Sequence, residues 1–189
     1  MRRLAPAFLL AALLGACAGG DGSVSSVDYA PQYDFSEFYA LTNGKAFRVV
    51  VAGNPFPALP IEESKRLLLP VMQANRPRPR LTFTYEVPAE RPHPDYRLVL
   101  VFDAANDLTA ARVCADQIRL KPVPSPAGRF TVFGVYCRND LALTQAVSST
   151  AATGPDDPRV GELFSHLFLV LFSDAPPFHR PPRGFFWPL

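Results

Sequence analysis

The chain has 189 residues, which is enough for one domain with a sizeable hydrophobic core. Its 19 basic and 17 acidic residues give a formal net charge of +2, and two of the basic residues, Arg2 and Arg3, lie in an N-terminal segment that we expect to be removed. The 17 basic residues that remain balance the 17 acidic ones. Because nucleic-acid binding usually needs a strongly basic domain or patch, we expect no nucleic-acid partner.

The first 16 residues have the layout of a secretory signal peptide. Arg2 and Arg3 supply a charged start, an apolar run extends from Leu4 to Leu14, and small residues end it. A membrane-spanning helix needs about 20 apolar residues, and this run is much shorter. We therefore predict that residues 1–16 are cleaved as a signal peptide.

The residues Leu14-Gly15-Ala16-Cys17, placed directly after the apolar run, resemble the lipobox of bacterial lipoproteins. The resemblance covers the signal region only, and Gly15 is a less usual second residue. It implies that Cys17 is acylated, becomes the mature N-terminus and anchors the protein to a membrane. Ala18, in a position where Asp favours retention in the inner membrane, implies an outer-membrane anchor facing the periplasm. The alternative is an ordinary signal peptide with a cysteine there by chance.

If Cys17 carries lipid, the other two cysteines, Cys114 and Cys137, form an even pair in an oxidising compartment. We predict a disulfide between them. Closing the loop between them would stabilise the fold by roughly 3 to 4 kcal/mol in the chain-entropy description.

The mature chain is expected to begin with a tether over residues 17–33, because the stretch after Cys17 is rich in glycine and serine. A domain over residues 34–174 follows. Its first elements are a short helix after Asp34, a strand at 47–51, and a helix over 60–75 that Pro70 should bend or end early.

Further along, alternating residues predict a half-buried strand over 81–87, and the apolar segment 96–102 predicts a central strand. A weaker strand is expected at 111–114. The runs 130–137 and 141–147 predict a hairpin, because turn-forming residues separate them.

The last predicted element is a helix capped by Asp157, with Pro158 at its first position and an apolar stripe after it. The element order predicts an α+β fold: a two-layer sandwich with a mixed, mostly antiparallel sheet of about five to six strands and two main helices on one face. Across 96–102 and 136–144 this order resembles TolB N-terminal-like domains and other uncharacterised periplasmic lipoproteins. That resemblance supplies no functional residues.

Catalytic patterns are weak. Histidine is the usual acid–base group near neutral pH, and His93, His166 and His179 each lack neighbours that make a site. Glu162 and His166 are one helical turn apart, and we expect them to be solvent-exposed. Asp103, with the other acidic residues that follow the central strand, is interpreted as a turn or cap residue. We predict no catalytic residues, no metal and no cofactor, and keep a hydrolase using His166 or His93 as a minor alternative.

The C-terminal tail, residues 175–189, contains five prolines, two arginines and the only tryptophan. Such proline density favours extended or disordered chain. Phe185, Phe186 and Trp187 are candidates for contact with a partner or a membrane, and the tail folding back over the domain is the third alternative.

These features predict a non-enzymatic envelope lipoprotein with an accessory or assembly role, which contacts a membrane through its anchor and an envelope protein through its domain and tail. The alternative is a lipid or small-ligand carrier with an apolar pocket between the sheet and the helices, lined by Phe130, Phe164 and Phe168.

Overall fold

The computed structural model describes residues 22–89, 94–123, 125 and 128–177. The predicted signal peptide, the predicted lipidation site Cys17, and the tail residues Phe185, Phe186 and Trp187 lie outside the described residues. So do His93 and His179.

The described residues contain a six-stranded mixed sheet with the strand order β1-β6-β5-β4-β2-β3. β2 runs parallel to both of its neighbours, β3 and β4, whereas the pairs β4–β5, β5–β6 and β1–β6 are antiparallel. The strands are β1 (Ser23–Tyr29), β2 (Ala46–Ala52), β3 (Thr82–Thr84), β4 (Tyr96–Phe102), β5 (Arg129–Arg138) and β6 (Leu141–Ala151).

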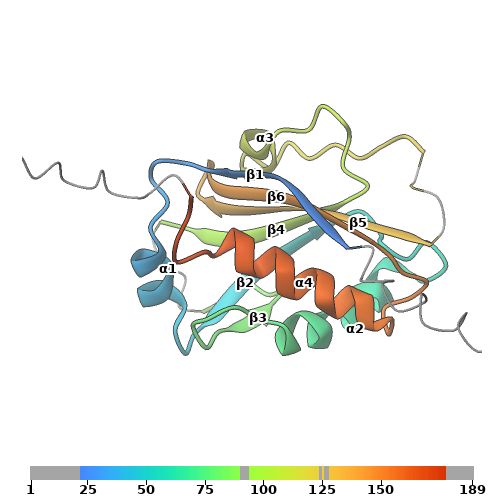
Figure 1. Cartoon of the computed structure of the whole chain (residues 1–189), viewed down its shortest axis with the longest axis horizontal. Coiled ribbons are helices and arrows are strands. Elements are labelled where there is room, and N and C mark those ends of the chain that lie inside the picture. Colours follow the sequence, from blue (N-terminus) through green and yellow to red (C-terminus); the bar gives the residue numbers. More distant parts are fainter. Residues whose placement is uncertain (1–21, 90–93, 124, 126–127, 178–189) are drawn as a thin grey trace, which may run out of the picture.

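Three helices, α1 (Phe35–Thr42), α2 (Ile61–Ala74) and α4 (Pro158–Leu171), lie on one face of the sheet, and the short α3 (Ala110–Cys114) lies on the other (Figure 1). The predicted α+β fold with its main helices on one face is confirmed. The predicted hairpin is also confirmed, because β5 and β6 pair antiparallel around Asn139 and Asp140.

The helix starts follow from local capping. The Asp34 carboxylate accepts a hydrogen bond from the Ser36 N–H at 2.7 Å, and the Asp157 carboxylate accepts one from the Arg159 N–H at 3.1 Å. The helix predicted over 60–75 is confirmed as α2, and of the two effects expected of Pro70, a bend or an early end, the early end does not occur, since α2 continues to Ala74. Pro70 lies on the exposed side, where water can satisfy the backbone carbonyl that loses its partner.

The hydrophobic core lies mainly between the sheet and α1, α2 and α4. All seven residues of β4 are buried, which confirms the predicted central strand. Aromatic rings dominate this layer. The ring centroid of Tyr136 on β5 is 5.5 Å from the ring centroid of Phe38 and 5.3 Å from that of Phe172. A smaller cluster on the other face includes Val99, Val135 and Val113, and α3 covers it.

Two predicted boundaries are wrong near the N-terminus. The tether was expected to reach residue 33, and the domain to begin at residue 34. Instead, residues 23–29 form β1, an edge strand that pairs with β6 in the same sheet. Its residues are mostly exposed and polar, so their pattern resembles a linker; the pairing with β6 supplies the order that the sequence alone does not indicate.

The predicted strand at 111–114 is also wrong, because these residues belong to the helix α3. The Thr109 side chain caps this helix by accepting a hydrogen bond from the Arg112 N–H. The apolar residues Ala110, Val113 and Cys114 pack against the sheet. They do so from one helical turn that covers the sheet, and not from a strand within it. The strand expected over 81–87 is shorter than predicted, since β3 contains only Thr82–Thr84.

Candidate functional site

A disulfide joins α3 to β5. Cys114 and Cys137 are bonded with a Cα–Cα distance of 5.6 Å, and both residues are fully buried. The predicted bridge is therefore confirmed. It connects the short covering helix on the second face to a central strand of the sheet.

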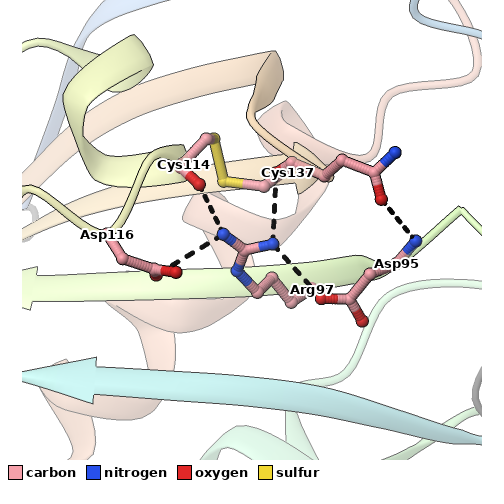
Figure 2. A network of polar contacts seen from close by, with 6 residues as sticks. Asp95, Arg97, Cys114, Asp116 and Cys137 are labelled. Atoms are coloured by element: carbon pink, nitrogen blue, oxygen red, sulfur yellow. Dashed lines mark hydrogen bonds and ion pairs between the residues drawn. A yellow bond between two sulfur atoms is a disulfide. The ribbon is translucent and has the colours of Figure 1, made fainter.

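Arg97 on β4 lies beside this bridge, and Figure 2 shows its guanidinium surrounded by oxygen atoms. One guanidinium nitrogen is 3.3 Å from the Asp95 carboxylate and donates to the Asn139 carbonyl at 3.1 Å. The other donates to the Cys114 carbonyl and lies 3.5 Å from the Asp116 carboxylate. The Arg97 side chain is only 6% exposed. These oxygen atoms therefore provide the hydrogen bonds that the buried guanidinium can no longer make to water.

The Arg97 network connects three parts of the fold: the start of β4, the β5–β6 turn and the end of α3. The turn is held further by two hydrogen bonds, from the Asn139 N–H to the Asp95 carbonyl at 2.7 Å and from the Asp95 N–H to the Asn139 side chain at 2.8 Å. The hydrogen-bond and ion-pair partners of the guanidinium are backbone carbonyls and carboxylates next to these same elements. This arrangement holds the start of β4, the β5–β6 turn and the end of α3 together.

A second polar group lies near the start of β4 and combines α1 with two strands. The Tyr96 hydroxyl donates to the Glu37 carboxylate at 2.6 Å, and Arg138 lies 3.3 Å from the other Glu37 oxygen. Burial raises the pKa of Tyr96, and its hydrogen bond to Glu37 raises that pKa further. The Tyr96 hydroxyl therefore stays protonated near neutral pH and acts as a hydrogen-bond donor.

Of the acid–base candidates in the sequence, Glu162 and His166 belong to the described residues. Glu162 and His166 are both exposed on α4, as expected. Within the part of the chain that the structure describes, no group of three or more His, Cys, Asp or Glu side chains is placed to hold a metal ion. The same residues include no helix with the length and apolar character needed to cross a membrane.

A cleft of about 350 Å³ opens beyond the carboxyl ends of β2 and β4. Pro55, Phe56 and Pro57 follow β2 and form one side, and Asp103 follows β4 directly. The chain turns sharply at both strand ends. Gly53 has φ +78°, and a Cβ there would overlap the Phe102 carbonyl, whereas Asp103 takes the left-handed region at φ +51°.

The carrier alternative placed an apolar pocket between the sheet and the helices, lined by Phe130, Phe164 and Phe168. Phe130 and Phe164 have ring centroids 6.0 Å apart, and Phe164 and Phe168 have centroids 5.5 Å apart. All three rings are buried core. They pack against one another, and Phe168 also borders a cleft of about 440 Å³ together with Phe35 and Asn75.

Sequence reasoning did not identify Arg97 or the cleft as features of the site. One signal for Arg97 was available: it is the single charged residue in an otherwise apolar central strand, and such a residue needs buried partners. The cleft had a weaker signal in the turn residues after the strands at 47–51 and 96–102.

Comparison with known proteins adds little. No family model matches the chain, and no curated protein matches it. Among solved structures, a PelC dodecamer from Paraburkholderia phytofirmans, in a variant with one substitution, is similar at a TM-score of 0.39 and 10% identity. The match covers 80% of this chain and 96% of that chain. A likeness at this level carries no conclusion about function.

Proposed function

We propose that the chain is the precursor of a lipoprotein anchored to the outer membrane and facing the periplasm, with a non-enzymatic accessory or assembly role through protein partners. The lipobox-like segment ending at Cys17 supports the anchor. The Cys114–Cys137 bridge supports an oxidising compartment such as the periplasm.

The observation that carries the proposal is the position of the first and last elements of the described chain, β1 and α4. Figure 1 shows that β1 begins at one end of the long axis and that the chain after α4 leaves at the opposite end. Six residue steps separate Cys17 from Ser23 at the start of β1, and an extended chain of that length reaches at most about 22 Å. An anchor at Cys17 would therefore keep the Ser23 end of the domain close to the membrane.

The other end, which carries the β5–β6 turn and residues 175–177, would then face the periplasm. The tail that follows contains Phe185, Phe186 and Trp187, which are residue types that often anchor protein interfaces. In this arrangement the anchor fixes the domain at one end and the tail is available to an envelope partner at the other.

In-cell crosslinking followed by mass spectrometry of membrane fractions tests this role. The native protein is compared with Cys17→Ser, with a triple variant that replaces Phe185, Phe186 and Trp187 by Ala, and with a matched tail control, Pro181→Ala with Pro182→Ala. We expect a defined partner with the native protein and the proline control, and loss of that partner in the other two. An unchanged partner set in the triple variant would contradict the role of the tail.

The carrier alternative is also supported by a specific observation, although not the one expected from the sequence. The cleft at the ends of β2 and β4 is lined by both apolar and polar residues, and its volume of about 350 Å³ lies within the usual range of small-molecule sites.

A further inference from the structure

The cleft lies where the chain diverges to opposite sides of the sheet. From β2 the chain continues through α2, on the face with the main helices, to β3. From the neighbouring parallel strand β4 it continues through α3, on the other face, to β5 (Figure 1). In open sheets, ligands bind outside the carboxyl ends of strands at such a switch point, because the diverging connections leave a crevice there.

The apolar floor of the cleft consists of packed aromatic rings. Phe56 stacks on Phe130 with centroids 5.4 Å apart and an interplanar angle of 25°, and Phe102 lies 5.3 Å from the same Phe130 ring. Phe56 and Phe102 are 7% and 1% exposed, so these rings form a fixed base, and the apolar surface that a ligand can contact belongs mainly to Pro55, Pro57 and Ala58.

The wall formed by residues 54–59 is rigid as well. The Asn54 side chain donates to the Leu59 carbonyl at 2.7 Å and accepts from the Phe56 N–H at 3.1 Å. It also accepts from the Ser64 hydroxyl at 2.9 Å, which ties the wall to α2. Preformed walls lower the entropic cost of binding a small ligand.

Two charged side chains line the cleft, and their surroundings differ. The Asp103 carboxylate is partly buried, and one of its oxygens accepts a hydrogen bond from the Ser125 N–H at 3.0 Å, which fixes its position. Arg129 is exposed, so solvent and salt screen its charge. Of the two charges, the Asp103 carboxylate is therefore the one that is held in place and less screened by solvent. Asp103 also takes a left-handed conformation, which its short polar side chain tolerates.

We propose that this cleft binds a small amphipathic amine, with its hydrocarbon part against Pro55, Pro57 and Ala58 and its ammonium group at the Asp103 carboxylate. Apolar burial supplies the affinity, and the carboxylate selects a cation over an anion of the same shape. The inference goes beyond the accessory role, because binding here requires neither the Cys17 anchor nor the tail.

The test compares two probes of the same shape and opposite charge, 4-fluorophenethylamine and 3-(4-fluorophenyl)propionate. Binding to the full-length protein in lipid nanodiscs is followed by fluorine NMR, with empty nanodiscs as the control for partitioning into lipid. We expect the amine to bind about ten-fold more tightly than the carboxylate, the factor produced by one ion pair of roughly 1.4 kcal/mol.

Three variants assign the binding to the cleft. Asp103→Asn can still accept the Ser125 hydrogen bond and tolerates the left-handed backbone, and it should remove the preference for the amine. Arg129→Gln, the matched loss of the other charge, should preserve that preference. Ala58→Trp, at an exposed lining residue, should block both probes while leaving the melting temperature unchanged within a few degrees.

The proposal is overturned by any of three results: neither probe binds at millimolar concentration, the carboxylate binds as tightly as the amine, or Asp103→Asn behaves as the native protein does. None of these results bears on the anchored accessory role, which the crosslinking experiment tests separately.

Discussion

Removing the disulfide should lower stability by an amount that follows from its position. The bridge closes a loop with a sequence separation of 23 residues. The chain-entropy relation gives about 11 cal/mol/K for that loop, or about 3.4 kcal/mol at 25 °C. For a domain of this size each kcal/mol shifts the melting temperature by about 2–4 °C, so the double variant Cys114→Ala with Cys137→Ala should melt roughly 7–14 °C lower.

The native structure should survive this change, because the Arg97 guanidinium still holds the Cys114 backbone carbonyl and thereby the end of α3. The change should therefore act mainly on the unfolded state, which becomes more expanded without the cross-link. The unfolding free energy of the double variant should then fall more steeply with urea concentration than that of the native protein. Urea titration followed by circular dichroism measures both quantities, and Cys17→Ser is the matched control. A loss below about 1 kcal/mol would refute the reasoning, since loop closure would then contribute little.

Three further predictions concern buried or capping groups. Tyr136→Phe should leave stability unchanged or raise it by about 1 kcal/mol in urea titration, because its buried hydroxyl has no hydrogen-bond partner among the described residues; a loss above 1 kcal/mol would argue against this. Arg97→Met should cost about 3–5 kcal/mol, since it leaves the Asp95 carboxylate without this cation, and a neutral result would show that the network is dispensable. The hydrogen bond from Arg159 lowers the pKa of Asp157 from its usual 3.8 to about 2. The stability that this pair contributes should therefore be present above about pH 4 and lost as the pH falls toward 2. Asp157→Asn should remove this component from the measured pH dependence of the unfolding free energy.

Much of the fold was predictable because the relevant signals are local. Asp34 and Asp157 cap their helices through side-chain hydrogen bonds to nearby backbone N–H groups, which the sequence shows directly. The segment Tyr96–Phe102 is apolar enough to require a central strand, and the turn at Asn139 and Asp140 indicates the hairpin.

The missed elements depend on contacts far away in the sequence. β1 is ordered by pairing with β6, more than one hundred residues later, and its serine-rich sequence has weak strand preference of its own. The segment Ala110–Cys114 is five residues long, too short for its periodicity to separate a strand from one helical turn.

The candidate site was hardest to predict because its parts converge only in three dimensions. The partners of Arg97 come from β4, α3 and the β5–β6 turn, and the cleft combines the ends of two strands that are fifty residues apart in the sequence. A sequence indicates which residues need partners but not which distant segments supply them. The tail and the anchor remain predictions from residue patterns alone.

The mass of the mature N-terminal peptide tests the anchor most directly. The protein is purified from membranes of the bacterium in which it is expressed, and its N-terminal peptide is analysed by mass spectrometry alongside the Cys17→Ser variant. We predict a peptide that begins at Cys17 and carries a diacylglyceryl group on its sulfur, and loss of that modified peptide in the variant. A mature protein that begins at another residue, or an unmodified Cys17, would contradict the anchored role.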